Sequence, residues 1–137
     1  MPIQRLTPQA LRKLLDGEVR QKATCVIKFY SNTCELCHNF HTDYVNISKD
    51  VSFQDLHFFA FNLADHPTID YELGFEGVPT IAVVSTSPQG LPAVEVCPDP
   101  PDPHPLTFLK PHHVKTFIRT QLDTRTTQEI IEEEGAI

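Results

Sequence analysis

The sequence has few basic residues and no long apolar run, and each shortage excludes a class of protein. Of its 137 residues only 11 are lysine or arginine, and no basic block accompanies the net charge of −7. Binding to nucleic acid or to anionic membranes is therefore not expected. No apolar stretch approaches the roughly 20 residues that span a bilayer. Apolar residues still make up 40% of the chain, which is typical of a single globular domain.

The N-terminal segment also lacks the apolar core of an export signal. The stretch "MPIQRLTPQALRKLLDGEV" instead has the pattern of an amphipathic helix, which Thr7 and Pro8 would begin. The compartment expected from this pattern is the reducing cytoplasm. Four cysteines in such a compartment are more often catalytic or metal-binding than a structural framework.

The hydrophobic pattern predicts helices and strands in the order α-β-α-β-α-β-β-α. Strands are expected where β-branched and aromatic residues cluster, and helices where apolar residues recur every three or four positions. The expected strands are residues 24–30, 56–63, 80–85 and 91–97, and the expected helices begin near Thr7, Cys34, Pro67 and Lys110. This order predicts an α/β fold with helices on both faces of one sheet.

A proline-rich stretch and an acidic tail depart from this alternation. Eight of the 12 prolines lie between Pro88 and Pro111, so "PDPPDPHP" is expected to be an extended surface loop. We predict one domain over residues 1–122, with residues 98–109 as a proline-rich insertion, and an acidic tail over residues 123–137. In the tail, Thr126 and Glu129 have the spacing of a capping box for a short helix, although fraying is equally expected.

The stretch "TCELCHNFH", residues 33–41, is the strongest candidate for chemistry. Cys34 follows a buried strand and begins a helix, where backbone N–H groups and the positive end of the helix dipole favour a thiolate. Cys34 is therefore the expected nucleophile. Cys37, one turn later, is the expected resolving thiol, which would attack a mixed disulfide formed by Cys34.

The same residues are compatible with two other kinds of site. Cys34, Cys37, His38 and His41 share one helix face and include the usual zinc ligands. Four ligands from two helical turns do not readily surround one ion, but two chains could share zinc or an iron–sulfur cluster through Cys34 and Cys37. A c-type haem tether fits "CELCH" by pattern alone. It would need an export route and a second axial ligand, and the only methionine is Met1.

A second motif, "GVPT", begins with Gly77, and its proline, Pro79, lies 42 positions after Cys37. It places Pro79 at the start of an expected buried strand. Because proline has no N–H to donate within a sheet, a proline in this position indicates a cis peptide bond or a turn.

The two motifs together resemble those of the thioredoxin superfamily. "VIKFYSNTCELC" is similar to the first motif of that family, and "FNLADHPTIDYELGFEGVPT" is similar to the second. The resemblance extends from Leu6 to Leu122 and excludes the proline-rich loop. The resemblance implies a thioredoxin fold with a central mixed sheet, Cys34 as attacking thiol, Cys37 as resolving thiol and Pro79 as a cis-proline. It also implies that Val78 offers its backbone to an extended substrate peptide.

The activity that this resemblance implies is that of a thiol–disulfide oxidoreductase in cell redox homeostasis, with a protein-disulfide reductase as the leading form. The partners would be disulfide-containing proteins and an external reductant or reductase, and no bound cofactor would be needed. The alternative is a thioredoxin-fold adaptor without turnover. Two departures from thioredoxins suggest it: Gly-Pro is absent between the cysteines, and the buried aspartate that thioredoxins have six residues before the first cysteine is absent. The intact pair Cys34 and Cys37 disfavours it.

Two residues are expected to tune the dithiol. Lys28 stands where thioredoxins have a buried aspartate, six residues before Cys34. Its ammonium would stabilise a Cys37 thiolate, lose its charge through desolvation, or extend to the surface. Glu35, between the cysteines, would raise the thiol pKa by like-charge repulsion. His38 and His41 are expected to be solvated.

The remaining cysteines are expected to be structural. Cys25 and Cys97 lie at strand positions and are interpreted as small buried apolar residues, with a regulatory thiol at Cys97 as the alternative.

Overall fold

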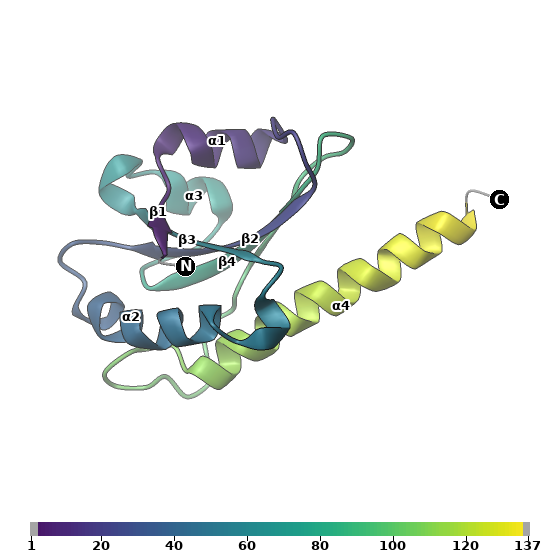
Figure 1. Cartoon of the computed structure of the whole chain (residues 1–137). Helices are drawn as coiled ribbons and strands as arrows, with labels where there is room; N and C mark the ends of the chain where they lie inside the picture. The colour runs from purple at the N-terminus through teal and green to yellow at the C-terminus, as the bar shows by residue number, and fades with distance from the viewer. Residues whose placement is uncertain (1–2, 136–137) are drawn as a thin grey trace.

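A computed structural model describes the backbone of residues 3–135 and the side chains of residues 3–123. It contains one five-stranded sheet in the order β1-β3-β2-β4-β5 (Figure 1). The strands are β1 (Gln4–Arg5), β2 (Ala23–Tyr30), β3 (His57–Asn62), β4 (Thr80–Thr86) and β5 (Ala93–Val96). The helices are α1 (Pro8–Asp16), α2 (Glu35–Ser48), α3 (Ile69–Leu73) and α4 (Pro111–Gly135), with 3-10 turns η1 (Val51–Phe53) and η2 (Leu63–Asp65).

The sheet is mixed, as a thioredoxin fold requires. Strands β1 and β2 both pair with β3 in parallel, whereas β4 pairs antiparallel with β2 and β5. The central strand β2 is buried along most of its length, which explains its run of β-branched and aromatic residues. In this register Lys28 lies between Ala60 of β3 and Ile81 of β4.

Helices cover both faces of the sheet and create two separate hydrophobic clusters. Helices α1 and α3 lie on one face, and α2 with the first part of α4 lies on the other (Figure 1). Successive side chains of β2 alternate between the clusters, since Val26 packs with α2 and α4 while Ile27 and Phe29 pack with α1 and α3. The alternation places Lys28 on the α2 side of the sheet.

The caps predicted for the first helix are confirmed. Thr7 is the N-cap of α1, and its hydroxyl accepts a hydrogen bond from the backbone N–H of Ala10 at 3.1 Å. Pro8 occupies the first turn. The helix ends at Gly17, whose φ of 75° is in the left-handed region that favours glycine.

Two elements differ from the sequence-based expectation. The structure adds β1, which has only two residues and becomes a strand by pairing with Phe59 and Ala60 of β3. Helix α4 continues to Gly135 through most of the segment expected to be a separate tail, and its second half projects beyond the sheet (Figure 1). The capping box expected at Thr126 and Glu129 therefore does not begin a separate helix. None of the described helices combines the length and the apolar character needed to cross a bilayer.

Residues 98–109 form the expected loop. They contain one isolated bridge, between His104 and Phe108. The amide of Asn39 on α2 donates a hydrogen bond to the carbonyl oxygen of Leu106 at 2.8 Å. The loop is therefore attached to the helix that carries the two motif cysteines.

Candidate active site

The motif cysteines lie where the central strand ends and helix α2 begins. Cys34 and Cys37 form a disulfide, with their Cα atoms 5.2 Å apart. Cys34 is the N-cap of α2, and its Sγ accepts a hydrogen bond from the backbone N–H of Cys37 at 3.0 Å. The sulfur of Cys34 thus takes the position that a capping oxygen usually occupies, at the positive end of the helix dipole.

The two sulfurs differ in their access to solvent. Cys34 is half-buried, whereas Cys37 is 2% exposed and lies on the buried side of α2 with Phe40, Tyr44 and Ile47. Only Cys34 is open to a large incoming molecule. The difference follows from helical spacing, because residues three and four positions apart from Cys37 continue the buried stripe.

The second motif faces the first cysteine. The Val78–Pro79 peptide bond is cis, and the carbonyl oxygen of Val78 lies 3.6 Å from Sγ of Cys34. Gly77 before it has a φ of 77°, which only glycine adopts readily, and its carbonyl accepts a hydrogen bond from the hydroxyl of Thr80 at 2.8 Å. The structure therefore brings Cys34, Val78 and Pro79 together from segments 44 residues apart in the chain.

Lys28 is buried beside this site. The residue is 4% exposed, so the suggestion that its ammonium reaches open solvent is wrong. Its Nζ lies 3.1 Å from Nδ1 of His41 and faces the rings of Tyr30 and Tyr44 at 5.6 and 5.3 Å. Burial lowers the pKa of Lys28 to about 8. At neutral pH the ammonium form still predominates.

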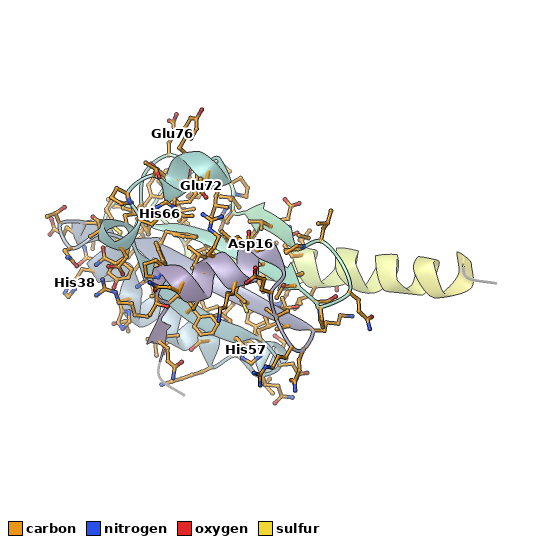
Figure 2. All side chains as sticks on the ribbon, turned by 90° about the horizontal axis from the view of Figure 1, so that it is seen from above. Asp16, His38, His57, His66, Glu72 and Glu76 are labelled. Carbon is orange, nitrogen blue, oxygen red and sulfur yellow. A yellow bond between two sulfur atoms is a disulfide. The ribbon has the colours of Figure 1, made fainter. Side chains whose placement is uncertain are left out.

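His41 is exposed, as expected from the sequence, and Nδ1 of its ring also lies 3.1 Å from Nζ of the buried Lys28. Burial, then the charge of Lys28, then His38 lower the pKa of His41. His38 is exposed as expected, and Figure 2 shows it at the outer edge of the molecule. The spacing of four residues between Cys37 and His41 was the signal that placed both on one helix face.

A cleft of about 350 Å³ connects these groups. Lys28, His41, Cys34 and Cys37 line it. The other polar residues that line it are Arg5, Tyr30, Ser31, Asn32 and His38. Of these, only His38 was expected near the sulfurs, because it shares a helix face with Cys34 and Cys37.

Two of these polar residues are held by partners from other segments. The guanidinium of Arg5, from β1, binds the carboxylate of Asp65 at 2.8–3.1 Å. The side chain of Asn32 accepts a hydrogen bond from Asn62 at 2.8 Å. These contacts depend on the pairing of β1 and β2 with β3, so sequence spacing alone does not reveal them.

Glu35 is exposed in the first turn of α2. Its predicted repulsion of the thiolate and the predicted roles of Val78 and Pro79 toward substrate stay predictions.

Cys25 and Cys97 are buried, as expected of small apolar residues. They are 2% and 5% exposed and form no disulfide. Burial raises the pKa of Cys25 to about 11, and burial with the nearby charge of Asp99 raises that of Cys97 to about 12. Because the thiolate is the reactive form, these values disfavour the regulatory thiol considered at Cys97.

Within the described residues, no group of three or more histidine, cysteine, aspartate or glutamate side chains has an arrangement suited to a metal ion. His66 does approach Glu72, at 3.0 Å, and Figure 2 shows the pair on the side of the molecule near α3. Arg12 binds the same carboxylate at 2.8 Å, so this cluster is an ion-pair network at the surface.

Comparison with known proteins agrees with this geometry. The family model for thioredoxin matches residues 7–95. A search of curated proteins finds no match. Among solved structures, the Trx4 domain of ERdj5 superposes with a TM-score of 0.63 at 16% identity, over 89% of this chain and 96% of that one.

Two further structures show the same fold. Chloroplastic thioredoxin z has a TM-score of 0.58 at 12% identity, over 88% of this chain and 94% of that chain. The J-Trx1 fragment of ERdj5 has a TM-score of 0.59 at 16% identity, and the match covers 88% of this chain but only 52% of the fragment. At such identities the likeness establishes the fold alone.

The mixed sheet, the helices on both faces and the Cys-x-x-Cys pair at disulfide distance define a thioredoxin-type protein, consistent with thiol–disulfide oxidoreductase chemistry. The chain belongs to the thioredoxin family.

Proposed function

We propose that this protein exchanges disulfides with protein substrates, using Cys34 as the attacking thiol and Cys37 as the resolving thiol. The observation that supports this most directly is the position of Cys34, which caps α2 and remains partly accessible while Cys37 is covered. Backbone N–H groups and the helix dipole favour a thiolate at this position. A nucleophile and a sheltered second thiol are the two parts that disulfide exchange needs.

The reaction proceeds through a mixed disulfide. The Cys34 thiolate attacks one sulfur of a substrate disulfide, forms a new S–S bond and expels the other substrate sulfur as a thiolate. Cys37 then loses its proton and attacks Sγ of Cys34, which releases the second substrate sulfur and leaves the Cys34–Cys37 disulfide. An external thiol reductant or a reductase returns both cysteines to the reduced state.

Substrate would bind along the backbone at Val78 and Pro79. The Val78 carbonyl lies 3.6 Å from Sγ of Cys34, so a peptide chain paired with this backbone would place its disulfide near the nucleophile. Val78 is half-buried and Pro79 is buried, so the backbone of Val78, rather than a long side chain, would contact the substrate.

Two finer predictions belong to the same proposal. Reduction of protein disulfides is the direction that the family resemblance favours, and the cytoplasm is the compartment expected from the sequence. A reducing compartment would supply the external reductant that the cycle requires.

Turnover with a disulfide-bonded protein tests the proposal. In an insulin reduction assay with dithiothreitol as the external reductant, the wild type should accelerate reduction, and Cys34→Ala should lower the rate to the uncatalysed level. Cys25→Ala is the matched control, because Cys25 is buried in β2 and has no part in the cycle. Catalysis by Cys34→Ala at the wild-type rate would overturn the proposal.

A further inference from the structure

Lys28 is a buried cation to which the described side chains offer no carboxylate. Lysine is rarely buried in proteins unless an anion pairs with it. Only 4% of the residue is exposed, and its hydrogen-bond partner is a ring nitrogen of His41. The rings of Tyr30 and Tyr44 face the ammonium at 5.6 and 5.3 Å, which offsets part of the cost of removing it from water. Among the side chains of residues 3–123, the disulfide form therefore offers Lys28 no full counter-charge.

We propose that the counter-ion of the Lys28 ammonium is the thiolate of Cys37, which exists only after the Cys34–Cys37 disulfide is reduced, and that His41 positions the ammonium for it. Lys28 and Cys37 line the same cleft, one from β2 and the other from α2. The strand alternation directs Lys28 toward α2. This inference rests on the proposed disulfide exchange and assigns a role that the exchange itself does not require.

The other charged groups around the cleft do not supply the anion. Arg5, from β1, is already paired with Asp65 of η2. His38 of α2 is exposed, and Glu35 is exposed at the start of the same helix. Tyr30 and Tyr44 present the faces of their rings to the ammonium and offer it no carboxylate. The lowered pKa of His41 keeps its imidazole neutral near pH 7, so the Lys28–His41 pair has one positive charge there.

The effect of this cation appears when the disulfide opens. A substrate thiolate attacks Sγ of Cys34, a new S–S bond forms, and the electron pair of the old bond leaves on Sγ of Cys37. The second substrate thiol loses its proton to solvent and attacks the mixed disulfide, which releases Cys34 as a thiolate. One substrate disulfide has formed, and two electrons now reside on Cys34 and Cys37. Lys28 stabilises the charge that develops on the Cys37 sulfur in the first step.

The reduced form of the protein is therefore stabilised relative to the disulfide. Stabilising the reduced form makes the disulfide a stronger oxidant and the dithiol a weaker reductant. Lys28 thus shifts the protein away from the reductase direction, compared with the same fold bearing a neutral residue at position 28.

The test is the equilibrium between the protein and a glutathione redox buffer at pH 7, followed by alkylation of free thiols. Lys28→Met should lower the equilibrium constant for reduction of the disulfide by about tenfold or more, since an opposite charge at close range shifts a thiol pKa by one unit or more. Tenfold corresponds to about 30 mV for this two-electron couple. His41→Leu should give a smaller decrease, Lys28→Arg should keep most of the wild-type value, and Lys49→Met, a charge removed from an exposed residue, should have no effect.

The pH dependence of the wild-type potential provides a second readout that does not depend on folding of a variant. Above pH 8 the disulfide form has lost the Lys28 proton, whereas the thiolate retains it in the reduced form. Reduction of the disulfide should therefore take up one additional proton above about pH 8. The plot of reduction potential against pH should become steeper there by about 30 mV per pH unit. Lys28→Arg should lack this change of slope.

An unchanged potential in Lys28→Met, or a wild-type slope without a break near pH 8, would overturn this inference. Either result leaves insulin reduction by Cys34 intact, so the failure of this inference is distinguishable from failure of the proposed function. A disulfide that forms and equilibrates normally but supports no turnover would contradict only the proposed function.

Discussion

At the scale of single residues, Lys28 determines the electrostatics beside the motif cysteines. Its side chain is buried on the α2 side of the sheet, where the ammonium contacts His41 and faces the rings of Tyr30 and Tyr44. Burying a cation without a counter-ion costs stability, because the charged group loses its contact with water.

The buried charge of Lys28 should reduce the stability of the oxidised protein. Burial lowers the pKa of Lys28 in the folded state to about 8, from an ordinary lysine value of 10.5, so the unfolded chain binds the proton more tightly. A shift of this size corresponds to about 3 kcal/mol, and the penalty is fully present below pH 8. We expect Lys28→Met to raise the free energy of unfolding at pH 7, with the advantage shrinking as the pH increases from 8 toward 10.

Urea denaturation of the oxidised proteins at several pH values would measure this difference. Lys49→Met is the appropriate control, because Lys49 is exposed. A Lys28→Met protein that is less stable than the wild type at pH 7 would contradict the conclusion that, among the described residues, the ammonium has no counter-ion in the disulfide form.

Cys34 and Cys37 could be identified from the sequence, because helix position and spacing are local properties. The contact between Lys28 and His41 depends on how α2 packs over β2, which no spacing rule provides. The sequence therefore identified Lys28 as a tuning residue but left open whether its ammonium was buried or at the surface.

At the scale of elements, long and strongly patterned segments were predicted well. The helix from Cys34, the strands around residues 24–30 and 80–85, and the loop of prolines all match the structure. Strand β1 was missed because two residues are too few for an alternation, and pairing with β3 alone makes them a strand. Helix α4 was predicted too short, although the sequence has no glycine or proline between Pro111 and Gly135 to end it.

Asp50 joins two of these elements. Its carboxylate binds Lys115 and Arg119 of α4 at 3.0 and 3.5 Å, and it caps η1 through Ser52. Hydrogen bonds from the hydroxyl and backbone N–H of Ser52, and then from Lys115, hold the pKa of Asp50 well below its usual range. Its contribution to stability is therefore present above the ordinary aspartate pKa and is lost as the pH falls below that value.

The expected outcome is that Asp50→Asn is less stable than the wild type at pH 7, since asparagine can still cap η1 but cannot pair with α4. The difference should begin to shrink as the pH falls below about 4, because the carboxylate of the unfolded chain then takes up a proton while that of the folded protein stays ionised. Thermal unfolding across this range measures it, with Asp55→Asn as the control for loss of an exposed charge nearby. A constant difference at every pH would show that the ion pairs contribute nothing.

At the scale of the whole molecule, the fold could be predicted from the order of the helices and strands in the sequence, whereas the cleft could not. The two motifs specified a thioredoxin fold because each is local and their spacing constrains the path of the chain between them. The cleft combines residues of β1, β2 and α2, and Ala60 of β3 also lines it. The division into a domain over residues 1–122 and a tail over residues 123–137 stays a prediction, as the continuous α4 crosses that boundary.

The central claim is that Cys34 forms a covalent intermediate that Cys37 resolves. The most direct measurement is intact-protein mass after Cys37→Ser has been mixed with insulin. The account predicts a stable mixed disulfide through Cys34, released by dithiothreitol and absent in Cys34→Ser. Association with insulin that is non-covalent and persists in Cys34→Ser, without any covalent adduct of Cys37→Ser, would contradict the claim and favour an adaptor.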